Sequence, residues 1–482
     1  MSFKPFRFST SSSAPRSSPP LAFGALRKPE AQPDFNGMPE RVAPPLSLVP
    51  LTPLSVAAPP LPEAPLEVEM RRSIFDFEAA AWDALVPRDE PQLRFEFLKA
   101  VETSRMGQNP SYFAVRQNAR IVAVAVAYET DIDLLTLASP KLNRFATAIR
   151  RGPLKRFLIA RAMSCGPVIT NCRPNLLLCP TLSPAAKQEA AQLLVRSLDK
   201  AQGGDLRVLF EYSNHAAHDF EAALEQAGYA RGASLPGTHL EIVWPDFESY
   251  MNAMRKFYRR SIKDDMAAGV DLDIRIESDF SALAGEACAL YENVLARASN
   301  VLERLTPEFF AALGSFEQAR LVTAREKSSG RLVGIELLLV GDTTIQDLYT
   351  GVDYALNDQQ SIYFNLIYPG IAMACREGFK TLSTGQTSYT FKSRLGVQPF
   401  GLSIFVKHRN PIINALIRRF KNVLCPVVET PTHRVFHDLP AANVLDNALA
   451  STRKTKRPNR KTSLASHNAT LKKAADSAVS PL

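Results

Sequence analysis

The sequence between residues 319 and 407 decides the fold. It runs ARLVTAREKSSGRLVGIELLLVGDTTIQDLYTGVD (319–353), SIYFNLIYPGIAMACREGF (361–379) and KTLSTGQTSYTFKSRLGVQPFGLSIFVK (380–407). Apolar runs separated by turn residues predict three consecutive strands, of which the third covers Ile345 to Thr350. A longer apolar segment then predicts a helix, and two further strands close the stretch. This order predicts an α/β domain whose mixed, largely antiparallel sheet is flanked by helices.

The sequence before this stretch repeats the same plan. It shows helices, a strand hairpin, a strand, a long helix, a strand, a short helix and a last strand. The hairpin strands are predicted at 112–115 and 121–128, and the last strand at 238–243. We therefore predict two tandem α/β domains, over residues 67–245 and 246–428, and expect the active site in the second.

The two ends of the chain differ from this body in composition. Residues 1–66 hold 15 of the 35 prolines, and proline lacks the N–H that helices and sheets need, so a disordered leader is predicted. Residues 429–482 are predicted as an extension that ends in a basic, disordered tail. From Ser451 onward this tail carries +7 of the net charge of +9, and the body is neutral. The charge of the whole protein is therefore no argument for a nucleic-acid partner, although a basic patch on one face of the body remains open.

Cysteine usage and hydropathy narrow the class of protein further. Six cysteines in 482 residues do not make a disulfide scaffold, and their spacing fits no zinc motif, so no metal site is predicted. No apolar run reaches the ~18 residues that a membrane span requires, and the N-terminus lacks a secretory signal. We expect a cytoplasmic protein without integral membrane contact.

The order of elements between about Trp82 and His408 resembles the GNAT acyltransferase superfamily. It is most similar to the branch with two such domains in tandem, as in the Fem-type peptidyltransferases and their FemAB-like relatives. The resemblance implies an N-acyltransferase in which an amine attacks an activated acyl group directly. The implied donor is acyl-CoA, such as acetyl-CoA, or aminoacyl-tRNA in the Fem-type manner, which would make tRNA a partner. The implied acceptor is an amine on a small molecule or a cell-envelope component.

The resemblance also implies a place for the donor. In these folds the helix after the central strand presents its N-terminus to the donor pyrophosphate, because that end carries unpaired N–H groups. Here the corresponding loop spans 351–360 and the helix is expected to begin at Ser361, so Gly351, Asp353 and Ser361 are candidate donor-binding residues. The loop has no glycine after Gly351, which departs from the superfamily's glycine-containing run. A plain polar connection is the alternative interpretation.

Three residues on the predicted strands are candidates for proton transfer. Asp347 and Tyr349 are expected on one face of the central strand, because strand side chains alternate with a period of two. Glu336 is a single charge within the apolar strand IELLLV, and a buried strand rarely keeps such a group without a reason. Amine acylation needs a base for the amine proton and an acid for the leaving group. Packing is the alternative role for Tyr349.

Two basic segments are candidates for binding anionic groups. In GQTSYTFKSRLG (385–396), Lys392 is a candidate catalytic cation, and Gln386 and Arg394 are candidate substrate ligands. In RKFYRRSIK (255–263), Arg259 and Arg260 are candidates to hold an anionic substrate across the cleft between the halves. A solvated basic surface is the alternative for both. A different class of function also stays open: a catalytically silent GNAT-like module that binds a partner.

Overall fold

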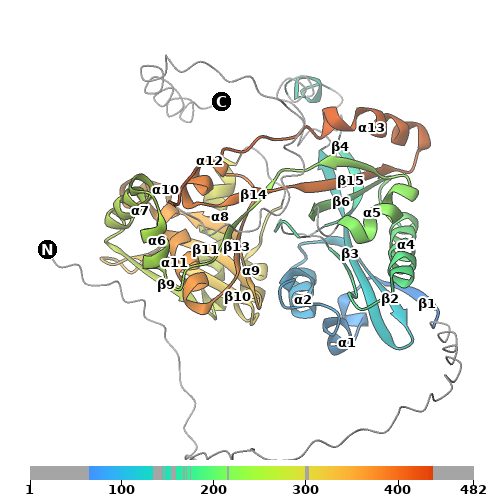
Figure 1. Ribbon diagram of the computed structural model, residues 1–482, viewed down its shortest axis with the longest axis horizontal. Coiled ribbons are helices and arrows are strands. Elements are labelled where there is room, and N and C mark those ends of the chain that lie inside the picture. The colour runs from blue at the N-terminus through green and yellow to red at the C-terminus, as the bar shows by residue number, and fades with distance from the viewer. Residues whose placement is uncertain are drawn as a thin grey trace, which may run out of the picture. The chain divides into compact units, whose positions relative to one another are not determined.

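The computed structural model describes residues 64–133, 144, 147–152, 159–166, 169, 171–173, 175–213, 217–298 and 303–437 (Figure 1). The predicted leader up to residue 63 and the basic tail lie outside the described residues. The described chain forms two mixed α/β sheets flanked by helices, which confirms the predicted fold class.

The first sheet is built almost entirely from the first half of the chain. Its strand order is β1-β2-β3-β4-β6-β15-β7, with β5 paired to β3. Of the strands that the structure describes in this sheet, only β4 and β6 pair in parallel. The elements are β1 (Leu66–Arg71), α1 (Ala79–Asp83), α2 (Phe95–Thr103), β2 (Gln108–Gln117), β3 (Arg120–Asp133), β4 (Ile159–Cys165), β5 (Leu176–Leu178), α4 (Pro184–Lys200), β6 (Leu206–Ser213), α5 (Ala217–Gln226) and β7 (Ala230–Ala233).

The second sheet has the order β14-β8-β13-β12-β11-β10-β9. Only β12 and β13 pair in parallel among its described strands. The elements are β8 (Gly237–Glu241), α6 (Phe247–Ala253), α7 (Lys256–Ala268), β9 (Leu272–Glu277), α8 (Ala284–Arg297), α9 (Pro307–Gly314), β10 (Ala319–Glu326), β11 (Leu332–Val340), β12 (Thr344–Val352), α10 (Tyr354–Gln360), α11 (Ile362–Glu377), β13 (Thr381–Gly385), α12 (Tyr389–Lys392), β14 (Gln398–Phe400), β15 (Leu402–His408) and α13 (Pro411–Leu424).

The two sheets exchange their last strands. The predicted last strand of the first half is β8, and it pairs with β13 and β14 in the second sheet. Conversely, β15 from the second half pairs with β6 and β7 in the first sheet. The expectation that residues 238–243 complete the first sheet is therefore wrong. The sequence of a short strand does not show which strand it will pair with, because the pairing depends on where the chain crosses from one sheet to the other.

Both crossings occur at the same place. The chain leaves the first sheet between β7 and β8 and returns to it between β14 and β15. The two crossing segments meet where the Ser234 N–H donates to the Leu402 carbonyl at 2.9 Å. Gly237 lies so close to the Phe400 ring that a Cβ there would be 2.4 Å from it. A cut between residues 245 and 246 would therefore remove one strand from each sheet.

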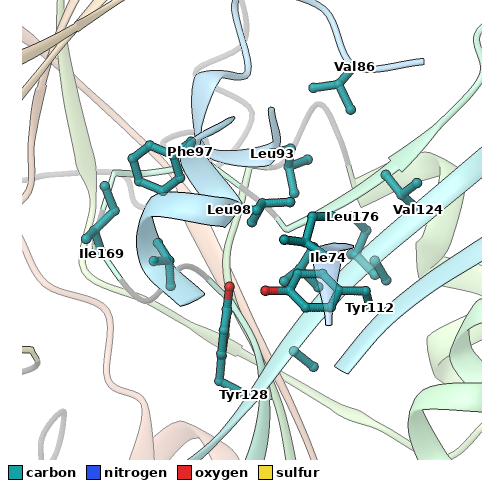
Figure 2. Packing of buried hydrophobic residues seen from close by; sticks show 14 of the residues in the cluster. Ile74, Val86, Leu93, Phe97, Leu98, Tyr112, Val124, Tyr128, Ile169 and Leu176 are labelled. Carbon is teal, nitrogen blue, oxygen red and sulfur yellow. The ribbon is translucent and has the colours of Figure 1, made fainter. Parts of the chain in front are cut away.

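One apolar core joins the two halves. In the first half, buried side chains from α2, β2 and β3 pack together (Figure 2). The same cluster continues into α8 and α9 of the second half, where the Phe97 ring contacts Phe309 and Phe316 with centroids 6.0 and 6.1 Å apart. The other face of the second sheet is covered by α11 and forms a separate core. Val435 and Phe436, within the predicted extension, belong to this second core. In the part of the chain that is described, no helix is both long and apolar enough to cross a bilayer.

Candidate active site

The site is built where β12 and β13 separate. The two strands pair in parallel at Thr344 with Thr381, Ile345 with Leu382 and Gln346 with Ser383, and the pairing then stops. Gly385 has a φ of 67°, which only glycine adopts easily, and it turns the chain away from β12. The edge of β12 beyond Gln346 is thereby left without a partner in β13. Open backbone groups at such an edge are available to a substrate.

A β-bulge in β12 decides which side chains face this opening. Asp347 pairs with Leu338 and Tyr349 pairs with Leu337, so Leu348 is an extra residue opposite β11. Leu337 and Leu338 belong to different cores on opposite faces of the sheet, and paired residues share a face. Asp347 and Tyr349 therefore point to opposite faces, and the prediction that they share one is wrong. The period of two holds only while the pairing is regular.

Glu336 and Asp347 form a buried carboxyl pair on the α11 face. Glu336 lies on the same face as Leu338, two residues along β11, and is 1% exposed, whereas Asp347 keeps partial solvent contact. Burial raises the pKa of both groups, and the charge of Asp347 raises the pKa of Glu336 further. Outside this pair, no described group donates to either carboxyl oxygen of Glu336. The raised pKa of Glu336 favours its protonated form beside Asp347.

Lys392 is buried beside this pair and holds a left-handed turn. It is 7% exposed, and its ammonium donates to the Thr384 carbonyl and, at 3.0 Å, to the Gln386 carbonyl. Burial lowers the pKa of Lys392, and the charge of Asp347 opposes that shift. An ammonium has three N–H groups, so one remains beyond the two carbonyl bonds. The alternative of a solvated surface is wrong for Lys392, which is a buried cation beside two carboxyl groups.

Two residues of the site were not anticipated from the sequence: Tyr363 near the carboxyl pair and Cys172 near Lys392. Tyr363, in the first turn of α11, bonds with Ser388, and burial together with the charges of Asp347 and Glu336 raises its pKa. Cys172 comes from the first half, and its pKa is raised chiefly by burial and by Glu211. Tyr363 sits in an apolar helical run and Cys172 in a loop, so no sequence pattern could have linked either to Asp347.

The first half contributes a loop to the opening. The side-chain amide of Asn171 donates to the side-chain oxygen of Gln346 at 3.1 Å. Gln346 is the last residue of β12 that pairs with β13. The Glu211 carboxylate holds this loop by accepting from the Asn171 and Cys172 N–H groups at 3.0 and 2.8 Å. Burial raises the pKa of Glu211 to about 8. The site is therefore completed by both halves.

Tyr349 belongs to the opposite face. Its hydroxyl bonds to the Glu303 carboxylate, and its ring packs against Tyr291 at 5.6 Å between centroids. This cluster lies on the side covered by α8, away from Glu336 and Asp347. Tyr349 is thus separated from the carboxyl pair by the sheet.

The predicted donor loop is a helix. Residues 354–360 form α10, and Asp353 caps it by accepting from the Ala355 N–H at 2.9 Å while pairing with Arg331 at 2.6 Å. Ser361 joins α10 to α11 in a left-handed conformation, with φ of 48°, and its side chain caps neither helix. Helix α11 begins after Ser361, as expected, but the preceding segment is the helix α10 instead of a loop.

Two further observations bear on the donor-binding candidates. The N–H of Tyr363 in the first turn of α11 is occupied by the Asn357 side chain at 3.0 Å, so it is not free for a phosphate. Gly351 lies against the backbone of α8, where a Cβ would be 2.6 Å from the Tyr291 nitrogen. The absence of a side chain at Gly351 serves helix–strand packing.

The remaining basic and polar candidates lie around the site at different depths. The Gln386 amide donates to the Leu235 carbonyl at 2.8 Å, which ties the Lys392 turn to the crossing segment. Arg394 is exposed. Arg259 donates to the Asn252 carbonyl at 3.3 Å, and Arg260 forms an exposed pair with Asp264 at 3.6 Å. Within the described ranges, no group of three or more His, Cys, Asp or Glu side chains is arranged for a metal ion.

Comparison with known proteins gives one family match. Residues 252–393 match the family described as an acetyltransferase (GNAT) domain. The matched segment includes Glu336, Asp347 and Lys392 and covers less than half of the chain. No curated protein matches.

Several solved structures share parts of the architecture at low identity. The crystal structure of FemX is 12% identical, covers 73% of this chain and 100% of its own, and has a TM-score of 0.48. A tandem GNAT protein from the clavulanic acid biosynthesis pathway is 12% identical over 72% of this chain and 99% of its own, with a TM-score of 0.37. A GCN5-related N-acetyltransferase from Kribbella flavida is 12% identical over 71% of each chain, with a TM-score of 0.34.

Proposed function

We propose that this protein, an acyltransferase whose residues 252–393 match a GNAT domain, transfers an acyl group to an amine at the opening between β12 and β13. The observation that carries the proposal is the buried Glu336–Asp347 pair at that opening, with Lys392 beside it. A buried carboxyl pair with few partners destabilises a fold. A module that only binds a partner would gain nothing from keeping it.

Asp347 acts as the base in this proposal. The amine nitrogen attacks the acyl carbonyl carbon, a C–N bond forms, and the bond from that carbon to sulfur or oxygen of the donor breaks. The ionised Asp347 carboxylate takes the proton that the amine loses and passes it to solvent, and the departing sulfur or oxygen takes up a proton from solvent. The raised pKa of Asp347 suits this role, because a base works best when its pKa is near the working pH.

Glu336, Lys392 and Tyr363 support this step in the proposal. Glu336 keeps its proton and donates a hydrogen bond to Asp347, which fixes the base in place. Lys392 offers its third N–H to the oxyanion that develops on the acyl group. Tyr363 keeps its phenol proton, since its pKa is raised, and can donate a hydrogen bond to the leaving group.

The donor is an acyl-CoA thioester, such as acetyl-CoA, or an aminoacyl-tRNA, and the acceptor is an amine on a small molecule or a cell-envelope component. Helix α10 replaces the open loop, and the Asn357 side chain occupies the Tyr363 N–H. Both observations favour a donor whose pyrophosphate is not bound at the N-terminus of α11. Asp353 is already paired with Arg331. Arg259, Arg260 and Arg394 are the nearby cations proposed to face a phosphate-bearing donor. Gly351, Ser361 and Gln386 then shape the backbone around the donor instead of binding it.

The test is a transfer assay with the full chain. Acetyl-CoA, longer acyl-CoA thioesters and aminoacyl-tRNA are each offered with a panel of primary amines, and amide products are measured by mass spectrometry. We expect product from one donor class, lost in Asp347→Asn. If no donor raises the melting temperature and no product forms, the silent binding module replaces the acyltransferase proposal.

A further inference from the structure

Helix α13 carries an apolar face that none of the described residues covers. Ile412, Leu416, Phe420 and Val423 are 72%, 53%, 50% and 59% exposed. Their spacing of four, four and three residues places them along one side of the helix. Val427 continues this apolar face beyond the end of the helix and is 81% exposed. Isolated exposed apolar residues are common, but a continuous row on one helix marks a contact surface.

The helix is fixed to the body by its other side. The Asn414 side chain donates to the Gly228 carbonyl and accepts from the His408 N–H, both at 3.0 Å. Ile417 packs against the small apolar cluster between β6 and β15. Asn410 caps the first turn by accepting from the Ile412 N–H at 2.9 Å. The fold therefore holds this row outward. Helix α13 itself contacts β7 and β15, and Figure 1 shows it next to β15.

Positive charge lies along one side of this apolar row. Arg409, Arg418, Arg419 and Lys421 lie on or next to the helix, and no acidic residue occurs between Leu402 and Val428. At about 100° per residue, Arg419 falls beside Ile412 at one border of the row. The Arg419 guanidinium lies 5.8 Å from the centre of the Phe420 ring. An apolar stripe on a helix whose charged side chains are all cations is the pattern of helices that lie in the surface of an anionic bilayer.

We propose that α13 docks on the surface of a lipid bilayer with anionic headgroups, its axis in the membrane plane. Ile412, Leu416, Phe420 and Val423 enter the boundary between headgroups and acyl chains, and Arg418 and Arg419 contact the headgroup phosphates. A second copy of this chain is a poorer occupant, because a two-fold contact would bring the cations of two helices together. The proposal does not depend on the acyltransferase reaction.

The experiment measures binding of the full chain to phosphatidylcholine vesicles with and without phosphatidylglycerol, by co-sedimentation. We expect binding only to the vesicles that contain phosphatidylglycerol. The double variant Leu416→Asp with Phe420→Asp should weaken this binding by about tenfold or more, because two apolar side chains no longer enter the bilayer. The matched control is Phe257→Asp, since Phe257 on α7 is also 72% exposed but lies outside α13, and it should bind like the unchanged protein.

Two further measurements distinguish membrane docking of α13 from the alternatives, which are binding by the basic tail and contact with a second copy. If the double variant binds vesicles as well as the unchanged protein, the basic tail alone accounts for binding and the proposal is overturned. A tryptophan placed by Phe420→Trp should be quenched by brominated phosphatidylglycerol, whereas one placed by Phe257→Trp should not. If vesicles are not bound, and the unchanged chain is a dimer that the double variant dissociates, the occupant is a second copy and the membrane proposal fails.

Discussion

Asp347 and Tyr349 are two residues apart on β12 and point to opposite faces of the second sheet, because Leu348 is an extra residue in the pairing with β11. The bulge brings Asp347 next to Glu336 on the α11 face and turns Tyr349 toward Glu303 on the α8 face. A regular strand would have placed both on one side. The chemistry proposed for the site thus depends on one irregularity in strand pairing.

This relationship gives a matched pair of variants. Asp347→Asn keeps the size of the side chain and removes the base, so we expect the transfer rate to fall by about 10²–10⁴-fold in a folded protein. Tyr349→Phe removes the hydroxyl that bonds to Glu303 on the opposite face, so its rate should stay within a few fold, with a stability loss of about 1 kcal/mol. Initial rates and thermal melts of both variants check this. Equal loss of rate in the two variants would contradict the assignment of faces.

Lys392 should matter for stability as well as for chemistry. Lys392→Met leaves the carbonyls of Thr384 and Gln386 without a donor in a turn where Gly385, Thr387 and Ser388 all have positive φ. We expect a loss of roughly 2–4 kcal/mol in the free energy of unfolding, since bonds from a charged donor are strong and buried carbonyls need partners. Urea unfolding measures it.

The control for Lys392 is Arg394→Ala. Arg394 is exposed, and exposed charges contribute little to stability, so its unfolding midpoint should not move. A Lys392→Met midpoint equal to that of the unchanged protein would refute the role of Lys392 as an anchor of the turn. The sequence left a solvated surface open as the alternative for both residues, and the structure shows that only Arg394 is exposed.

Glu211 should make the protein less stable as the pH rises. Its pKa in the folded state is about 8 against an ordinary value of 4.5, so the folded state binds the proton more tightly than the unfolded state. The stabilisation that Glu211 contributes to the folded state is fully present below pH 4.5. It is lost as the pH rises toward 8, by up to about 1.4 kcal/mol of unfolding free energy per pH unit. Glu211→Gln keeps an acceptor for the Asn171 and Cys172 N–H groups and removes the titration.

The measurement for Glu211 is the free energy of unfolding at pH 5 and pH 8. We expect Glu211→Gln to be the more stable protein at pH 8 and to differ little at pH 5. Glu286→Gln, at an exposed position on α8, is the control and should follow the unchanged protein at both values. A Glu211→Gln variant that is less stable than the unchanged protein at pH 8 would show that the carboxylate is ionised and needed there.

The sequence predicted most of the second half because its elements carry local signals. The strand runs of β10, β11 and β12, and the apolar helix α11, were predicted within a few residues. Glu336 was identified as a site candidate from its isolation in an apolar strand, and the structure places it with Asp347 and Lys392. These predictions rest on periodicity and on the cost of burying charge, which are properties of short segments.

What could not be predicted depends on contacts between distant segments. The bulge at Leu348 is defined only against β11, and α10 replaces a loop that was expected from the resemblance alone. Cys172 and Tyr363 reach the site from segments about 190 residues apart. The exchange of β8 and β15 also depends on distant contacts, because the sequence of each short strand would allow it to pair in either sheet.

The strand exchange predicts that neither half folds alone. A fragment of residues 67–245 lacks β15, which lies between β6 and β7, and a fragment of 246–428 lacks β8, which lies between β13 and β14. Each fragment would expose sheet edges and the apolar surface around Phe97 and Phe309. When expressed separately, both fragments should be insoluble or bind a hydrophobic dye. When fragments 64–245 and 246–437 are expressed together, they should form a soluble one-to-one complex with one cooperative melt. Far-ultraviolet circular dichroism and size-exclusion chromatography decide the outcome. A monomeric, cooperatively folded fragment of 246–428 would show that β8 is dispensable and that the second half is an independent domain.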